Sequence, residues 1–345
     1  MNAVMNAMVI DRICDLSHDN NPLSSVQLPL PVPGSQEVLI KVSACGVCHT
    51  ELDEIEGRTA PASFPMVPGH QVVGRVVGKG PGADRFSQGD RIGVAWIYSA
   101  CGACEFCRGG LENLCPGFKA TGRDSNGGYA EFMVANQHFA YQIPERFSDQ
   151  QAAPLLCAGA IGYRSLALTG LEDGQRLGLT GFGASAHLVL KMVRHRFPGT
   201  RVYVFARSTD EQAFAKELGA VWAGHTDQPP TEALDCIIDT TPAWNPVIQA
   251  LKSLRPAGRL VINAIRKEAA DQQKLMTLDY THHLWQEKEI KSVANVARRD
   301  VQAFLELADQ MALAPQVQTY RLQEANQALL ELKQRRIRGA KVLLL

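Results

Sequence analysis

The segment RLGLTGFGASAHLVLKMV, residues 176–193, contains the pattern that decides the fold. An apolar strand-like stretch runs into a glycine-rich turn, and a helical pattern follows the turn. Gly181, Gly183 and Ala186 form the spacing G-x-G-x-x-A. The first glycine permits the tight turn, the second lets the backbone approach a pyrophosphate, and the small alanine lets the helix pack close to the strand. Taken alone, the segment fits either a plain glycine-rich turn or the start of a βαβ unit that binds a dinucleotide, and the pattern that follows it favours the dinucleotide-binding unit.

The chain continues to alternate between strand and helix beyond this turn. Strands are expected at residues 176–180, 201–205, 234–239 and 259–262, and helices at 184–196, 210–218 and 246–254. Such alternation is typical of a parallel sheet with helices on both faces. We therefore expect an α/β fold with a doubly wound parallel sheet, of the Rossmann type, over residues 151–299.

The strand expected to end at Phe205 bears on the choice of nicotinamide cofactor. An acidic residue at this strand end would bind the adenosine ribose of NAD. Here the strand is followed by Arg207 and Ser208, and no carboxylate stands at its end. These two side chains would hold a 2′-phosphate through charge-assisted hydrogen bonds. We therefore expect NADP(H), with NAD(H) as the alternative if Arg207 is only a solvated surface side chain.

The rest of the chain has a β-rich pattern. Short apolar stretches, such as residues 37–42 and 72–77, are separated by glycine and proline turns. The tail contains two helical stretches, 301–312 and 323–334, and a last strand at 340–345. We expect the tail to return to the first domain. One domain then comprises residues 1–150 and 300–345, and the other comprises residues 151–299.

A cluster of cysteines lies within the β-rich part. Cys101, Cys104, Cys107 and Cys115 follow the spacing C-x2-C-x2-C-x7-C. Four thiolates on a glycine-broken loop suit a tetrahedral structural zinc ion. An iron–sulfur cluster is the rival, because its bacterial motif shares the two short gaps and the following proline, but its last gap is three residues rather than seven.

Composition limits the setting in which these sites work. Lysine plus arginine and aspartate plus glutamate both number 35 among the 345 residues. No overall positive charge therefore attracts nucleic acid or anionic lipid, which argues against a zinc-ribbon-type binding module. The first residues carry no basic segment, and no apolar run of about eighteen residues occurs. We expect a cytoplasmic protein with no membrane or nucleic-acid partner, whose nine cysteines serve as metal ligands or buried apolar residues.

Several motifs together resemble a known family. CGVCHTEL with Cys48, VPGHQVVG with His70, the four-cysteine lobe, APLLCAGA with Cys157 and the dinucleotide turn occur in this order. The same order is found in zinc-dependent medium-chain alcohol dehydrogenases, and the chain looks most similar to the bacterial branch near the cinnamyl-alcohol-dehydrogenase-like enzymes. The resemblance covers nearly the whole chain. It implies that the β-rich domain is GroES-like and carries two zinc sites.

The resemblance also implies roles for individual residues. Cys48, His70 and Cys157 would be the three protein ligands of a catalytic zinc, the ligand type that general coordination chemistry records for alcohol dehydrogenase. Glu51 would orient His70 by accepting its other ring proton. The Thr50 hydroxyl would accept a hydrogen bond from the zinc-bound alcohol and relay its proton. Further expected roles are a contact with the cofactor pyrophosphate at His49 and substrate-pocket positions at Trp96 and Ile55, although Trp96 would also fit a place in the core.

The chain departs from the family pattern at three places. Gln71 stands where most relatives have glutamate, which removes a carboxylate from near the metal. Asp53 stands where many relatives have the histidine that ends the proton relay, and it either replaces that base or is an exposed acid. Ala340 stands where many relatives have an arginine that reaches the pyrophosphate, a role that Arg338 or Lys341 would then take.

The function implied is a reversible, NAD(P)-linked oxidation of primary alcohols to aldehydes. Because Ile55 replaces a tryptophan of yeast-type relatives, we expect a roomier, apolar pocket that accepts aromatic or medium aliphatic substrates. A polyol or formaldehyde-type dehydrogenase of the same superfamily is the main alternative, and a non-catalytic nicotinamide binder is a further one. We expect a homodimer or homotetramer.

Overall fold

The computed structural model describes residues 3–313, 315–334, 336 and 339–345, and the chain folds into two compact units. Unit 1 comprises Met1–Cys157 and Ala297–Leu345, and unit 2 comprises Ala158–Val296. The expected boundaries at residues 150 and 300 therefore need correction by several residues. Unit 2 begins where helix α4 (Ala158–Thr169) begins, so Cys157 belongs to unit 1 rather than to the dinucleotide-binding part.

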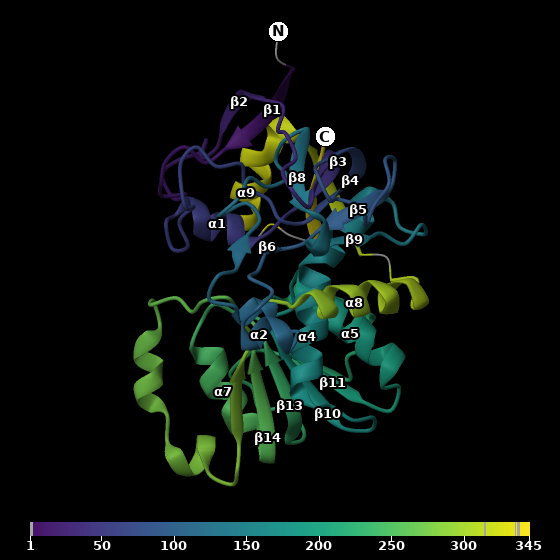
Figure 1. The fold of residues 1–345 in the computed structure, drawn as a ribbon. Coiled ribbons are helices and arrows are strands. Elements are labelled where there is room, and N and C mark those ends of the chain that lie inside the picture. The colour runs from purple at the N-terminus through teal and green to yellow at the C-terminus, as the bar shows by residue number, and fades with distance from the viewer. Residues whose placement is uncertain (1–2, 314, 335, 337–338) are drawn as a thin grey trace. The chain divides into compact units, whose positions relative to one another are not determined.

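Unit 2 is built on a six-stranded parallel sheet (Figure 1). Its strand order is β12-β11-β10-β13-β14-β15. The bounds are β10 Arg176–Thr180, β11 Arg201–Phe205, β12 Trp222–Gly224, β13 Leu234–Asp239, β14 Leu254–Ile262 and β15 Glu289–Ser292. The strand order reverses between β10 and β13, and in doubly wound sheets ligands bind at the carboxyl ends of the strands at such a point. Every residue of β13 is buried, as expected for a strand covered on both faces.

Helices cover both faces of this sheet. They are α4, α5 (Ala184–Arg196), α6 (Thr209–Glu217) and α7 (Asn245–Ser253), with short helical turns η4 (Gln272–Thr277) and η5 (Tyr280–Leu284). In Figure 1, α7 lies on one side of the strands and α4 and α5 lie on the other. The doubly wound parallel sheet predicted from the sequence is confirmed.

The sequence pattern missed parts of unit 2. Strands β12 and β15 were not expected, because β12 is short and all four residues of β15 are exposed, so neither has an apolar pattern. Strand β14 begins at Leu254, earlier than expected, because the chain passes from α7 straight into the strand and reaches its regular pairing with β13 after an irregularity in register.

Unit 1 is β-rich. Its main sheet has the order β16-β17-β3-β4-β5-β9, and β8 also pairs with β3. The bounds are β3 Glu37–Val47, β4 Val72–Lys79, β5 Arg91–Val94, β8 Phe132–Asn136, β9 Ala140–Gln142, β16 Val317–Arg321 and β17 Ala340–Leu344. Two smaller pairs join β1 (Val4–Val9) to β2 (Ser24–Pro29) and β6 (Ile97–Ser99) to β7 (Lys119–Ala120). Strand β17 pairs with β3, which places the C-terminal tail in unit 1.

The helices of unit 1 are mostly short. They are α1 (His49–Ile55), α2 (Glu105–Arg108), α3 (Asp149–Ala152), α8 (Arg298–Gln310) and α9 (Ala325–Lys333), with the turns η1 (Glu112–Leu114), η2 (Gln137–Phe139), η3 (Ala153–Leu156) and η6 (Leu322–Glu324). Helix α8 begins before the expected start because the Asp300 carboxylate accepts a hydrogen bond from the Ala297 backbone at 2.8 Å. None of the helices in the described ranges is long and apolar enough to cross a membrane.

Candidate active site

Unit 1 brings together the three residues expected to hold a catalytic metal. The Cys48 sulfur lies 3.6 Å from His70 Nε2, and that nitrogen lies 3.4 Å from the Cys157 sulfur. All three ligand atoms lie within 4.8 Å of one another. Zinc bonds of about 2.3 Å to sulfur and 2.0 Å to nitrogen place tetrahedral ligands at such separations. Two thiolates and an imidazole therefore fit zinc and leave one position for an oxygen ligand.

The local structure explains how each ligand is presented. Cys48 is the residue from which α1 starts, and its sulfur accepts the Thr50 backbone N–H at 3.3 Å. His70 follows Gly69, whose φ of +97° turns the chain toward the site. A side chain at Gly69 would strike the Tyr129 ring at 2.4 Å, so only glycine fits this position. Cys157 follows η3 at the end of the first segment of unit 1.

Glu51 lies behind the histidine ligand. Its Oε1 lies 2.7 Å from His70 Nδ1, and its Oε2 accepts the Cys48 backbone N–H at 2.8 Å. Both the Glu51 and His70 side chains are buried. The contact leaves Nε2 facing the two sulfurs, which is the orienting function expected of a carboxylate behind a metal-binding histidine.

Two of the ligands, His70 and Cys48, hold protons more tightly than usual when no metal is bound. Burial lowers the pKa of His70, but the charges of Glu51 and Cys48 outweigh this effect and raise it well above its ordinary value. A hydrogen bond with Cys157 and burial raise the pKa of Cys48. A metal ion must displace these protons, so we expect its uptake to weaken as the pH falls.

The four-cysteine lobe forms a second cluster in unit 1. The ligand atoms of Cys101, Cys104, Cys107 and Cys115 lie within 4.8 Å of one another. The Cys101 sulfur accepts the Cys104 backbone N–H at 3.3 Å. Backbone hydrogen bonds from Ala103 and Cys104 lower the pKa of Cys101 to about 6, which favours the thiolate form that binds zinc. All nine cysteines are free of disulfides.

The dinucleotide turn lies at the carboxyl end of β10 in unit 2. Gly181 has a φ of +78°, which favours glycine, and Gly183 has open space where a side chain would stand. Helix α5 begins after Gly183 without a side chain to cap its first N–H groups. An open glycine and an uncapped helix N-terminus fit a pyrophosphate. Ala186 is fully buried, as close helix packing requires.

The two residues expected to choose the cofactor follow β11. Arg207 is exposed and forms no ion pair within the part of the chain that the structure describes. Ser208 caps α6, because its hydroxyl oxygen accepts the backbone N–H groups of Asp210 at 3.2 Å and Glu211 at 3.3 Å. Its O–H remains available as a donor. A free guanidinium beside a hydroxyl suits a phosphate group.

Two expectations from sequence need correction. Asp53 is not an exposed acid: it is buried, and its Oδ1 lies 2.6 Å from the Arg58 guanidinium. Ile55 is fully buried in the hydrophobic core of unit 1, so it does not line an open pocket. Both errors arise because α1 turns five consecutive residues inward, which no local pattern indicates.

Other expected residues have varied surroundings. Trp96 is buried in a small apolar cluster, with its ring 5.1 Å from that of Phe118. His49 is exposed and Thr50 is half-buried at the start of α1. Lys341 is buried and bound to Glu331 at 2.6 Å, so it does not replace a missing arginine at a pyrophosphate. Arg338 lies outside the described residues.

Sequence reasoning missed a third buried acid on α1. Glu54 is fully buried, and among the described residues neither of its carboxylate oxygens has a hydrogen-bond partner. The available signal was the run of acids ELDEIE directly after the first metal ligand.

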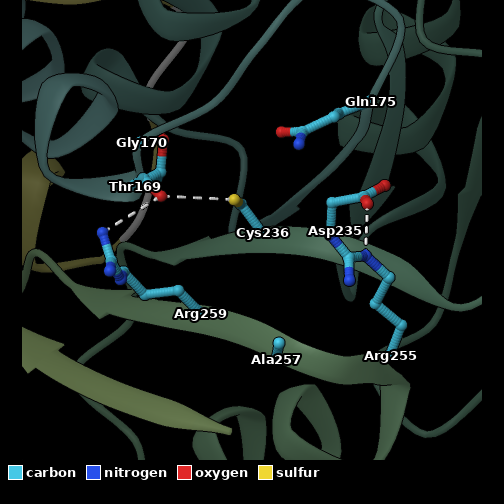
Figure 2. A pocket seen from close by; sticks show the side chains of 8 residues that line it. All are labelled: Thr169, Gly170, Gln175, Asp235, Cys236, Arg255, Ala257 and Arg259. Atoms are coloured by element: carbon cyan, nitrogen blue, oxygen red, sulfur yellow. Dashed lines mark hydrogen bonds and ion pairs between the residues drawn. The ribbon is translucent and has the colours of Figure 1, made fainter. Parts of the chain in front are cut away.

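A separate pocket of unit 2 contains none of the expected site residues (Figure 2). It lies at the amino ends of β10, β13 and β14, the edge opposite the glycine turn. Its charged groups bind one another: Arg255 pairs with Asp235, and Arg259 pairs with Glu289 and donates to the Thr169 carbonyl. The pocket is therefore a structural feature of the sheet edge.

The β-rich unit contains a zinc-type ligand set, and the parallel α/β unit contains a dinucleotide turn. Together these two features define a metal-dependent nicotinamide dehydrogenase. Comparison with known proteins agrees. Residues 34–145 match the alcohol dehydrogenase GroES-like domain. The chain is 41% identical over 332 residues to a probable alcohol dehydrogenase of Mycobacterium tuberculosis, covering 95% of this chain and 94% of the relative.

Plant relatives give the same result. A probable cinnamyl alcohol dehydrogenase of Oryza sativa is 32% identical and covers 92% of this chain and 90% of its own. The structure of a Sorghum bicolor cinnamyl alcohol dehydrogenase superposes with a TM-score of 0.84 at 28% identity, covering 99% of this chain and 97% of that one. The chain belongs to the zinc-dependent medium-chain alcohol dehydrogenase family, and it is an NAD(P)-linked alcohol oxidoreductase.

Proposed function

We propose that this enzyme interconverts primary alcohols and aldehydes with aromatic or medium aliphatic side chains, and that it prefers NADP(H). The observation that carries the proposal is the convergence of Cys48, His70 and Cys157 on one point in the same unit as Thr50. The plant relatives named for cinnamyl alcohol support the aromatic substrate class. The exposed Arg207 and Ser208 support the phosphate-bearing cofactor.

The chain's own residues have distinct parts in the proposed mechanism. Zinc bound by the three ligands would supply Lewis acidity, which lowers the pKa of an alcohol and stabilises negative charge on its oxygen. Glu51 holds His70 in the orientation that presents Nε2. The Thr50 backbone is fixed by the Cys48 sulfur. We assign its hydroxyl as a proton relay, which accepts a hydrogen bond from the alcohol and passes its own proton on as it takes the proton of the alcohol. Asp53, one turn further along α1, is the next proton acceptor, with Arg58 as its charged partner.

Further parts of the proposal concern the cofactor and the assembly. His49 is exposed at the start of α1, and we assign it the contact with the cofactor pyrophosphate that the family resemblance implies. Each chain holds two zinc ions, the second in the four-cysteine lobe. Nine free cysteines suit a reducing compartment, which supports the cytoplasm. We propose a homodimer or homotetramer, which light scattering of the purified protein would check.

Initial rates of cinnamaldehyde and benzaldehyde reduction test this function. The zinc-replete enzyme is assayed with NADPH and with NADH, before and after treatment with a chelator. We expect faster turnover with NADPH and loss of turnover after chelation. Arg207→Ala should raise the KM for NADPH about tenfold, the value of a lost charge-assisted hydrogen bond, and leave NADH kinetics unchanged. Arg194→Ala, at an exposed position on α5, is the matched control.

Other outcomes would change specific parts of the proposal. Preference for NADH would remove the phosphate-binding role of Arg207. Turnover of sorbitol or formaldehyde without turnover of the aromatic aldehydes would replace the substrate class with that of a polyol or formaldehyde-type dehydrogenase.

A further inference from the structure

Lys267 has an unusual place for a lysine, because its side chain is buried at the carboxyl edge of the unit 2 sheet. Only 8% of the side chain is exposed. Its ammonium donates to a carboxylate oxygen of Asp239, to the Thr241 carbonyl at 2.7 Å and to the Ala243 carbonyl at 3.1 Å. An ammonium has three N–H donors, so all of them are used. The lysine thereby fastens the loop of residues 239–243, which follows β13.

Asp239 joins this loop to the neighbouring strand. It is the last residue of β13 and is fully buried. Its second oxygen, Oδ1, accepts the Thr180 hydroxyl and the Thr241 hydroxyl, the latter at 2.8 Å. Thr180 is the last residue of β10. The Asp239 carboxylate therefore lies where the strand order reverses.

The loop that Lys267 fastens packs directly against the dinucleotide turn. A side-chain carbon at Gly181 would lie 2.8 Å from Thr240 Oγ1 and 3.0 Å from Thr241 Cγ2. The Thr240 hydroxyl and backbone N–H both donate to the Thr180 carbonyl, at 2.9 and 3.0 Å. Any shift of this loop therefore moves the backbone that must approach the pyrophosphate.

The positive charge of Lys267 has a second effect, in addition to fastening the loop. A buried ion pair adds little net stability compared with apolar residues of the same size, so stability alone is a weak reason to keep one. An unpaired carboxylate next to a pyrophosphate would repel its negative charges, and in the protein interior this repulsion is screened less than in water. The Lys267 ammonium cancels the Asp239 charge at the place where the cofactor phosphates would bind.

We infer that Lys267 is a positioning residue for the dinucleotide: it neutralises Asp239 and fixes residues 239–243 under the glycine turn. This inference rests on the proposed binding of a nicotinamide dinucleotide at that turn. The residues involved all belong to unit 2.

Fluorescence titration of the purified full-length protein with NADPH tests the inference without an activity assay. Lys267→Met should weaken NADPH binding about tenfold, because the buried Asp239 carboxylate then has no countercharge beside the cofactor phosphates. Asp239→Asn combined with Lys267→Met should recover most of the lost affinity, since no carboxylate then faces the phosphates. Lys267→Arg keeps the charge and should bind within about twofold of the wild type. Lys252→Met, at an exposed position on α7, is the matched control.

The outcomes separate this inference from the proposed function. If the wild-type protein binds neither NADPH nor NADH, the proposed function fails and the inference fails with it. If the wild type binds NADPH and Lys267→Met binds it equally well, only the inference is overturned. A loss in Lys267→Met that the double variant does not reduce also overturns it, because that result describes a purely structural lysine. If Lys267→Met does not fold, Lys267→Gln replaces it, because the glutamine amide can still donate hydrogen bonds to the loop carbonyls. Lys267→Gln is then compared with the double variant that also carries Asp239→Asn, under the same criteria.

Discussion

Helix α1 is seven residues long and carries three acidic residues whose surroundings differ. Glu51 contacts His70 and Asp53 pairs with Arg58, whereas Glu54 is fully buried without a partner. Burial raises the pKa of Glu54 well above its ordinary value, and the charge of Glu51 adds to the effect. Glu54 therefore stays protonated at pH values at which a glutamate in water is ionised.

The stability of the protein should depend on pH through Glu54. Because the pKa of Glu54 is higher in the folded than in the unfolded state, its contribution is fully present below the unfolded pKa and is lost as the pH rises toward the folded pKa. Glu54→Gln removes this loss. We expect the free energy of unfolding of the variant, relative to the wild type, to increase steadily between pH 5 and pH 9 in urea titrations.

Glu56, two positions further on, gives a control of opposite sign. Burial raises the pKa of Glu56, but hydrogen bonds from Lys333 and Arg58 outweigh burial and lower it below its ordinary value. Its contribution to stability is present above the unfolded pKa and is lost as the pH falls. Glu56→Gln should therefore be less stable than the wild type at pH 7 and approach it near pH 3. Parallel behaviour of the two variants would contradict this account.

Gln71 directly follows the histidine ligand in the chain. Its side chain is buried, and its amide nitrogen has no hydrogen-bond partner among the described residues. Gln71→Glu adds a negative charge next to His70, which favours the protonated form of a bound alcohol. We expect the kinetic pKa that governs alcohol oxidation to rise, as measured from the pH dependence of kcat/KM. An unchanged pH profile would refute the prediction.

At the level of elements, a buried lysine joins strand β17 to its neighbours in unit 1. Lys341 is 1% exposed, and its ammonium contacts Glu331 of α9 at 2.6 Å, as well as Tyr320 of β16. Hydrogen bonds from Lys341 and Tyr320 lower the pKa of Glu331 to about 2. One side chain thus holds together the three elements that bring the C-terminal tail back to unit 1.

Removal of this lysine should destabilise the tail more than removal of a surface lysine nearby. Lys341→Met leaves Glu331 without its buried partner, and we expect a loss of about 3 kcal/mol in the free energy of unfolding. Lys333→Met breaks a more exposed pair with Glu56 and should cost about 0.5 kcal/mol. Urea denaturation of both variants at pH 7 measures the difference. Equal losses would show that the buried pair has no special role in the tail.

The elements that could be predicted from sequence are those with a local signal. The glycine turn at 181–186 and the four cysteines at 101–115 are short-range patterns, and the structure brings both sets of residues together. The strand at 289–292 was missed because none of its residues is buried. The ion pair between Lys267 and Asp239 joins two separate segments of the chain, and no periodic pattern in the sequence indicates such a contact.

At the level of the whole molecule, the catalytic ligand set was assigned by resemblance rather than by spacing. Cys48, His70 and Cys157 come from separate segments, so only the folded unit brings them within 4.8 Å. The same unit holds the four-cysteine lobe, which is fastened to α8 by an ion pair of 2.6 Å between Glu112 and Arg298. One unit therefore contains two clusters of side chains that could hold a metal ion, one beside helix α1 and one in a loop with few apolar residues.

Metal content should separate the two sites by their effects on stability and on activity. Cys107→Ser removes a ligand from the lobe, where zinc replaces a hydrophobic core, and should reduce zinc from two to one per chain. We expect the midpoint of thermal unfolding to fall by roughly 5 °C or more. Cys157→Ser should also leave one zinc per chain but abolish aldehyde reduction, with little change in the unfolding midpoint, because unit 1 keeps its hydrophobic core without this ligand. Atomic absorption measures the zinc content and calorimetry measures the unfolding midpoint of the same samples. If Cys107→Ser keeps two zinc ions, or if the two variants lose the same stability, the lobe does not depend on zinc for its structure.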